Sequence, residues 1–145
     1  MRILVVCDGN SCRSQMAEAF LKDFEPSAEV YSAGIKPESD IFNYTEIVMS
    51  EAFIDMAGCK PKSIESFLYM NIDYLITLSN SSRDKCRKLQ GKIKNRIHIP
   101  VEDPASLIGT EEEILEKYRE VRNKIKYEMY DFYLNNLSPG DSNAV

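Results

Sequence analysis

The feature that most constrains the fold is a short apolar run, Ile3 to Val6, that leads into a cysteine-containing loop and then into a helical pattern. The loop opens at Cys7 and carries Arg13 after five intervening residues, and the helical pattern covers Gln15 to Phe24. A buried strand that turns through a tight loop into a helix is the first half of a βαβ unit. The start of the chain therefore predicts an α/β fold with a binding loop at the carboxyl end of its first strand.

Strand-like runs alternate with helical patterns, and this alternation predicts a single-domain α/β fold whose parallel sheet has helices on both faces. The runs are Ile3 to Val6, Val30 to Ala33, Tyr74 to Leu78 and Arg96 to Ile99. A helix near Glu46 to Met56 should follow a polar loop, Lys36 to Asn43, that stands near the mouth of the binding loop. The last helix should be the longest, because Thr110 and three glutamates form a capping-box start before apolar residues at helical spacing.

The length of 145 residues predicts one domain over residues 1–137, and the turn-forming residues 138–145 predict a flexible C-terminal tail. The net charge of -5 argues against a nucleic-acid-binding protein. A basic cluster within residues 83–96 predicts a solvated surface, with a docking surface for an acidic partner as the alternative. Without a signal-peptide pattern or a membrane-spanning apolar run, we expect a cytoplasmic monomer with no membrane contact.

The cysteines are too sparse for a disulfide scaffold and lack the paired spacing of a zinc site. They are Cys7, Cys12, Cys59 and Cys86. Catalytic or redox use is expected for them, except for Cys59, which follows a predicted helix end and is expected to be structural. The single histidine, His98, lies between isoleucines in a strand-like run, which favours a structural role as well.

The residue types of the loop indicate an oxyanion site with a thiolate at its floor. Five residues between Cys7 and Arg13 let the backbone N–H groups curl into an anion nest at the positive end of the following helix. The planar Arg13 fork suits a tetrahedral oxyanion, and with the helix dipole it favours the ionised form of Cys7. An inert buried thiol is the alternative. The expected oxyanion-binding residues are Asp8, Gly9, Asn10, Ser11, Cys12, Arg13 and Ser14.

Two residues of this loop carry further expectations. Ser14 is expected to be the N-cap of the helix. Asp8 places a carboxylate in a loop meant for anions, which would disfavour the Cys7 thiolate unless the side chain points outward, as we expect.

Asp103 is the expected proton donor to a leaving group. A thiolate that attacks a phosphoryl group releases an oxygen that needs a proton. Pro104 restricts Asp103 to extended conformations that hold its carboxyl in place, in a loop after the fourth strand-like run. An Asx turn before a helix is the alternative, and Glu102 is a weaker candidate for the same task.

The chain from Ile3 to about Lys126 resembles the low-molecular-weight protein tyrosine phosphatase superfamily, and within it most closely the thioredoxin-coupled arsenate reductases. The segments that carry this resemblance are Cys7 to Glu18, Ser32 to Ile35, Lys60 to Ser63, Asp84 to Cys86, Asp103 to Ala105 and Gly109 to Glu112. The resemblance implies a four-stranded parallel sheet of order 2-1-3-4. It also implies that Cys7 is the nucleophile, that Arg13 clamps the transition state and that Asp103 is the acid.

The same resemblance implies the substrate and the partners. The substrate would be arsenate, phosphate or a phosphomonoester, and a reductase would draw electrons from reduced thioredoxin, glutaredoxin or a small thiol. No cofactor is required, although a potassium ion is implied near Asn10, Glu18 and Ser32.

The thiol relay of the arsenate reductases is interrupted in this chain. Release of arsenite from a Cys7 adduct needs a second thiol that attacks the sulfur. The resemblance places the first relay thiol at Ser79, whose hydroxyl cannot exchange with disulfides, and the second at Cys86. Cys86, Cys12 or an external thiol would then complete the reduction. Phosphatase relatives also imply a protective disulfide between Cys12 and Cys7, with simple packing of Cys12 as the alternative.

We therefore expect an arsenate reductase-like enzyme in which Cys7 attacks arsenate and a further thiol completes the reduction. The alternative is a phosphatase that hydrolyses phosphomonoesters through a Cys7 thiophosphate with Asp103 as general acid. The aromatic residues Phe42 and Tyr44 at the expected mouth favour the phosphatase, whereas Ala105 after Pro104 is typical of the reductases. A non-catalytic phospho-ligand-binding module is disfavoured, because nucleophile, clamp and acid are all present.

Overall fold

The computed structural model describes residues 1–138 and contains a four-stranded parallel sheet of order β2-β1-β3-β4. The strands are β1 (Arg2–Cys7), β2 (Glu29–Gly34), β3 (Ile72–Thr77) and β4 (Ile93–His98). The helices are α1 (Arg13–Phe24), α2 (Asn43–Glu51), α3 (Asn80–Lys85) and α4 (Glu111–Asn136), with short 3-10 turns η1 (Ile64–Phe67), η2 (Cys86–Lys88) and η3 (Pro104–Ser106). The predicted fold class and the implied strand order are confirmed. Apart from Ser138, the expected tail lies outside the described residues.

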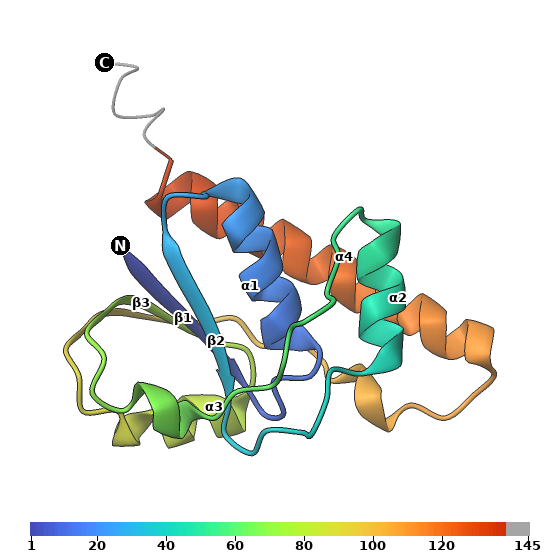
Figure 1. The fold of residues 1–145 in the computed structure, drawn as a ribbon, viewed down its shortest axis with the longest axis horizontal. Helices are drawn as coiled ribbons and strands as arrows, with labels where there is room; N and C mark the ends of the chain where they lie inside the picture. The colour runs from blue at the N-terminus through green and yellow to red at the C-terminus, as the bar shows by residue number, and fades with distance from the viewer. Residues whose placement is uncertain (139–145) are drawn as a thin grey trace.

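Two hydrophobic cores lie on opposite faces of the sheet, because alternate residues of each strand point to opposite faces. Ile3 and Val5 of β1 face a large core with α1 and α4, whereas Leu4 and Val6 face a smaller core closed by η1 and by Cys86. Figure 1 shows α1 lying across α4 with α2 beside them, while α3 lies apart from these three helices. Helices on both faces were predicted, and the two layers are unequal.

The capping box predicted for the last helix is present. Thr110 Oγ1 accepts a hydrogen bond from the Glu113 backbone N–H at 3.2 Å, and the Glu113 carboxylate accepts one from the Thr110 N–H at 3.3 Å. The residues of α4 that face the core are Tyr118, Val121, Ile125, Met129 and Phe132. None of the helices within residues 1–138 is both long and apolar enough to cross a membrane.

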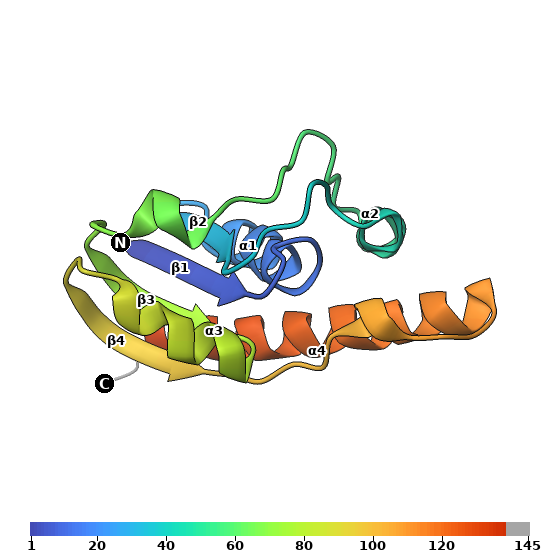
Figure 2. The ribbon, with the colours of Figure 1, turned by 90° about the horizontal axis from the view of Figure 1, so that it is seen from below.

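Some boundaries differ from the prediction. The helix expected to reach Met56 ends at Glu51, because Phe53 has a φ of +63° and left-handed backbone terminates a helix. Strands β3 and β4 begin two and three residues earlier than expected, at Ile72 and Ile93, since these two residues pair with each other. The carboxyl ends of β1 and β3 meet at one edge of the sheet, where their loops lead into α1 and α3 (Figure 2).

Candidate active site

The loop between β1 and α1 is enclosed by the segment that follows β2. The backbone carbonyls of Cys7, Asp8, Gly9 and Ser11 accept hydrogen bonds from the N–H groups of residues 35, 36, 38 and 42. The carbonyls therefore point away from the interior of the loop, as an anion nest requires. The polar segment expected only to stand near the mouth thus wraps the outside of the loop.

A glycine and an asparagine let the loop take this shape. A Cβ atom on Gly34 would lie 2.8 Å from the Asp8 carbonyl oxygen and 2.9 Å from the Asn10 nitrogen, so only glycine allows this close approach. Asn10 has a φ of +53°, a left-handed conformation that asparagine tolerates. The end of β2 and the loop between β1 and α1 are therefore in direct backbone contact.

The buried amide of Asn10 ties the loop to its surroundings. Its nitrogen donates hydrogen bonds to Ser14 Oγ at 2.8 Å and Ser32 Oγ at 2.9 Å. Its oxygen accepts from Gln15 Nε2 at 3.0 Å and from the backbone N–H of Lys62 at 2.7 Å. Both ends of the amide are thus occupied, which holds the loop rigid without using its inward N–H groups.

Ser14 contacts Cys7 and does not cap the helix, so the predicted N-cap role is wrong. Helix α1 begins at Arg13 with Cys12 at the N-cap position, which leaves Ser14 inside the first turn. Its Oγ lies 2.8 Å from Cys7 Sγ and accepts the Asn10 amide proton. A Ser14 hydroxyl that donates its proton to the sulfur would stabilise a thiolate there.

Arg13 is buried, with 4% of its surface exposed, and its guanidinium pairs with two carboxylates. Its Nη1 donates to the Val101 carbonyl oxygen at 3.0 Å, while Nη2 lies 3.3 Å from Asp8 Oδ2 and 3.4 Å from Asp103 Oδ2. These contacts hold the planar fork over the loop, where it can pair with a tetrahedral oxyanion.

The Asp103 carboxyl both forms the Asx turn and reaches the site, so the two interpretations given for it are compatible. Its Oδ1 accepts a hydrogen bond from the Ala105 backbone N–H at 3.0 Å, which is the Asx turn, and its Oδ2 faces Arg13. The turn thus holds the carboxyl at the site. Glu102 instead pairs with Lys117 at 3.4 Å, away from the loop.

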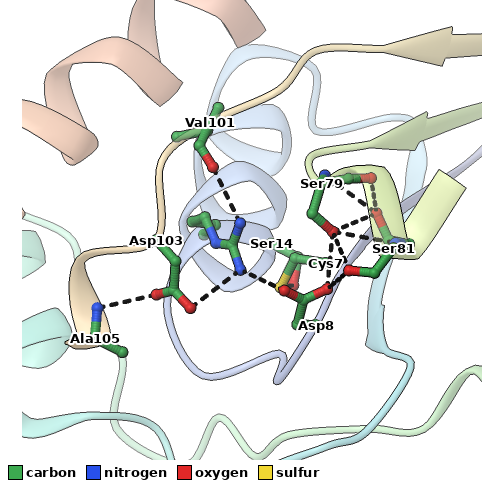
Figure 3. A network of polar contacts seen from close by, with 10 residues as sticks. Cys7, Asp8, Ser14, Ser79, Ser81, Val101, Asp103 and Ala105 are labelled. Carbon is green, nitrogen blue, oxygen red and sulfur yellow. Dashed lines mark hydrogen bonds and ion pairs between the residues drawn. The ribbon is translucent and has the colours of Figure 1, made fainter.

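The carboxylate of Asp8 does not point outward, so this expectation is wrong. Its Oδ1 accepts hydrogen bonds from Ser79 Oγ, at 2.9 Å, and from Ser81 Oγ, while its Oδ2 faces Arg13 (Figure 3). Burial acts to raise the pKa of Asp8, but the hydrogen bonds from Ser81 and Ser79 and the charge of Arg13 outweigh it, so the pKa is lowered. The hydroxyl and guanidinium donors explain the inward orientation.

A cavity of about 160 Å³ joins these groups. Its lining residues are Cys7, Asp8, Gly9, Ser11, Cys12, Arg13, Lys36, Glu38, Phe42, Asp103 and Ala105. Tyr44, the other expected mouth residue, does not line it, because its ring packs 5.3 Å from the ring of Tyr118. A larger hollow of about 420 Å³ beside the end of α2 is lined by neither a cysteine nor an arginine.

The structure places Cys12, but not Cys86, in the cavity with Cys7. Cys12 lines the cavity, and burial raises the pKa of its thiol to about 12. Cys86 is fully buried in the smaller core with Leu4 and Val6, where burial raises its pKa to about 11. All four cysteines are free, and Cys59 packs at the edge of the large core.

Sequence reasoning missed the role of the serines that begin α3. Ser79 caps the helix in a capping box with Ser82, and both Ser79 and Ser81 bond to Asp8. The serine run indicates a helix start. Its contact with Asp8 depends on the neighbouring positions of β1 and β3 in the sheet, which the local sequence does not disclose.

Two further expectations concern the surface around α3. His98 Nδ1 lies 2.8 Å from Thr77 Oγ1 and its Nε2 lies 3.1 Å from Asn80 Oδ1, contacts that suit the expected structural role. In the basic cluster, Arg87 pairs with Asp84 at 3.9 Å, as expected of a solvated surface.

The residues near the implied potassium site do not fit a potassium ion. The ammonium group of Lys62 lies 3.3 Å from Glu18 Oε1 and 3.4 Å from Ser32 Oγ, and Lys22 Nζ lies 2.6 Å from Glu18 Oε2. The Asn10 oxygen is also occupied, by two N–H donors. Within residues 1–138, no cluster of three or more His, Cys, Asp or Glu side chains is placed to hold a metal.

Comparison with known proteins confirms the resemblance. The family model described as low molecular weight phosphotyrosine protein phosphatase matches residues 2–139. An arsenate reductase of Bacillus subtilis (strain 168) is 37% identical over 131 residues, which cover 90% of this chain and 93% of the relative. One from Oceanobacillus iheyensis is 39% identical over 125 residues, which cover 85% of this chain and 88% of the relative.

Solved structures agree with these relatives. A structure described as an arsenate reductase in the oxidized state has a TM-score of 0.76 at 26% identity and covers 90% of this chain and 94% of its own. Another, in the phosphate binding state, has a TM-score of 0.74 at 27% identity and covers 92% of this chain and 97% of its own. The chain therefore belongs to the low molecular weight phosphotyrosine protein phosphatase family and is an enzyme of that family.

Proposed function

We propose that this enzyme reduces arsenate, with Cys7 as the nucleophile and an external thiol as the reductant. The observation that carries the proposal is the placement of Cys7 Sγ 2.8 Å from the Ser14 hydroxyl, in a cavity closed by Arg13. The relatives named arsenate reductase, which match most of this chain, support arsenate as the oxyanion.

The first step joins sulfur to arsenic. The Cys7 thiolate attacks the arsenic atom, an S–As bond forms, and one arsenate oxygen leaves as water after protonation. Arg13, the inward N–H groups of the loop and the start of α1 stabilise the negative charge on the remaining oxygens. Ser14 stabilises the thiolate before attack, by the hydrogen bond to Cys7.

The second step transfers two electrons to arsenic. An external thiolate attacks Cys7 Sγ, an S–S bond forms, and the electron pair of the S–As bond leaves with arsenic as arsenite. A further thiol of the donor then reduces this disulfide and restores Cys7. Reduced thioredoxin, glutaredoxin or a small thiol can supply both thiols.

An external thiol is preferred because neither internal candidate is prepared to attack. Burial raises the pKa of Cys12 to about 12 and that of Cys86 to about 11, so both are protonated at neutral pH. Cys86 also lies in the core on the opposite face of the sheet from Cys7. This chemistry suits the reducing cytoplasm, and we propose that the chain acts there as a monomer.

The test is arsenate-dependent NADPH oxidation, coupled separately through thioredoxin and through glutathione with glutaredoxin. Turnover should disappear in Cys7→Ser and persist in Cys86→Ser and Cys12→Ser. Absence of arsenate-dependent oxidation with every donor would contradict reduction, whereas loss of turnover in Cys86→Ser or Cys12→Ser would assign the second thiol to the chain itself.

Hydrolysis of phosphomonoesters is the second candidate, favoured by Asp103. Its carboxyl lines the same cavity as Cys7 and could protonate the leaving oxygen of an ester. Hydrolysis of an aryl phosphate that falls by about 100-fold in Asp103→Asn would support this activity. Ester hydrolysis without arsenate turnover would replace the first proposal.

A further inference from the structure

We propose that Asp8 makes the cavity selective for oxyanions that carry a proton, such as arsenate and phosphate, over oxyanions that carry none, such as sulfate. This role rests on the proposed function, because it specifies which form of anion the same cavity takes.

Asp8 lies beside the position that an anion bound to Arg13 would occupy. Its carboxylate lines the cavity together with Cys7, and its Oδ2 lies 3.3 Å from Arg13 Nη2. The other terminal nitrogen of Arg13 is committed to the Val101 carbonyl oxygen at 3.0 Å. An oxyanion that pairs with the available side of the guanidinium therefore places an oxygen next to Asp8.

The Asp8 carboxylate is held in this position from the opposite side. Ser79 and Ser81, at the start of α3, both donate hydrogen bonds to its Oδ1. Its Oδ2 faces Arg13 instead, and Figure 3 shows Ser79 and Ser81 together on one side of Asp8. The same donors lower the pKa of Asp8 against the opposing effect of its burial, so the group is ionised at neutral pH and can only accept hydrogen bonds.

An acceptor at this position distinguishes anions by their protons. Arsenate and phosphate retain a hydroxyl at neutral pH, and that hydroxyl can donate a charge-assisted hydrogen bond to Asp8. Sulfate has no proton, so one of its oxygens would face the carboxylate oxygen with nothing between them. A site built around a hydrogen bond rejects an analogue that cannot make it, because the half-buried acceptor loses its partner.

The other charged groups around the cavity do not make this distinction. Glu38 and Lys36 are exposed at its mouth and act on every anion by charge alone. Asp103 also reaches Arg13, at 3.4 Å, but its other oxygen is used in the turn with Ala105. Asp8 is the carboxylate of the three that both the loop and α3 hold in place.

The same discrimination separates a free oxyanion from an ester. At neutral pH a phosphomonoester is mainly a dianion whose phosphorus carries no hydroxyl, so it cannot donate to Asp8. Free arsenate can. Asp8 therefore favours the inorganic anion over the ester within a cavity whose nucleophile and clamp suit both.

The experiment is calorimetric titration of the reduced protein with inorganic phosphate and with sulfate at neutral pH. Phosphate replaces arsenate in this test because it has the same shape and charge but is not reduced. It should bind about tenfold or more tightly than sulfate. In Asp8→Asn the ratio should fall to about one, because the amide can donate to sulfate. Glu38→Gln removes one negative charge from the same mouth and should strengthen both anions without changing the ratio. Equal binding of both anions to the wild-type protein, or an unchanged ratio in a folded Asp8→Asn, would overturn the role.

A second variant keeps the test informative if Asp8→Asn does not fold. Ser81→Ala removes one of the hydroxyls that hold the carboxylate and should lower the ratio of affinities, by a smaller factor of about threefold. An unchanged ratio in Ser81→Ala would then count against the role. Because these titrations need no turnover, selectivity without arsenate reduction would contradict only the proposed function, and reduction without selectivity would contradict only the role of Asp8.

Discussion

The two faces of the sheet hold two buried thiols in opposite chemical surroundings. Cys7 ends β1 beside the Ser14 hydroxyl and in the same cavity as Arg13, whereas Cys86 begins η2 in an apolar core with Leu4. Both side chains are almost completely buried, with exposures of 1% and 0%. Burial alone therefore does not decide what a cysteine does. Cys7 has a hydroxyl 2.8 Å from its sulfur and shares a cavity with Arg13, and we expect these groups to make it the nucleophile, whereas Cys86 packs among apolar side chains.

Removal of each thiol in turn tests this difference most directly. Cys7→Ser should lower activity toward arsenate or an aryl phosphate by at least about a thousandfold, because the nucleophile is lost. Cys86→Ser should change it less than about twofold and act mainly on stability. Steady-state rates and urea unfolding of both variants provide the measurement, and comparable losses of activity in the two would show that the second core takes part in the reaction.

The next effect concerns Arg13, the cation that lines the cavity of Cys7. Arg13→Lys keeps the charge but loses the planar pair of donors, and kcat/KM should fall about 100-fold. The matched control is Arg83→Lys on α3, whose side chain is not among those lining the cavity and whose replacement should leave kcat/KM unchanged. An active Arg13→Lys enzyme would show that charge alone suffices at the site.

A smaller effect, an increase in arsenate turnover, is expected when a thiol is introduced at Ser79. Ser79→Cys puts sulfur where Ser79 Oγ lies 2.9 Å from Oδ1 of Asp8, a residue that lines the cavity. Thioredoxin-coupled arsenate turnover should rise several-fold, because a thiol there can attack the Cys7 adduct, and aryl phosphate hydrolysis should stay nearly unchanged. Ser79→Ala is the control for loss of the hydroxyl. No gain would mean that the relay is lost for other reasons or is already bypassed.

The smallest effect is on stability at the base of the loop. Burial acts to raise the pKa of Glu18, but hydrogen bonds from Lys22 and Ser32 and the charge of Lys62 outweigh it, so the pKa is lowered. The ionised group therefore stabilises the fold above its unfolded-state pKa of about 4.3, and this contribution is lost as the pH falls through the folded-state value.

Glu18→Gln should cost about 1 kcal/mol of unfolding free energy at pH 7 and less at acidic pH. Urea unfolding at several pH values measures the difference. Asp23→Asn, at an exposed position of the same helix, is the control and should show no such dependence. A loss in Glu18→Gln that persisted unchanged in acid would mean that the carboxylate charge is not what stabilises the loop.

Most of the fold follows from local patterns in the chain. Apolar runs of strand length, the Thr110 capping box and the spacing of Cys7 and Arg13 each depend on residues a few positions apart, so they are visible in the sequence. The exit from α2 was missed because Phe53 adopts a left-handed backbone that its residue type does not announce. The inward carboxylate of Asp8 was missed because its partners, Ser79 and Ser81, lie more than seventy positions away.

The amino-acid sequence alone predicts a parallel α/β sheet and a loop after the first strand that carries a cysteine and an arginine. Which other groups reach that loop depends on the tertiary structure. Asp8 turns toward α3 because β1 and β3 are neighbours in the sheet, and Lys62 occupies the cation position beside Glu18 because its segment pairs with the end of β2. Such contacts depend on how distant segments pack together, and the energies that select them are not encoded in any one stretch of residues.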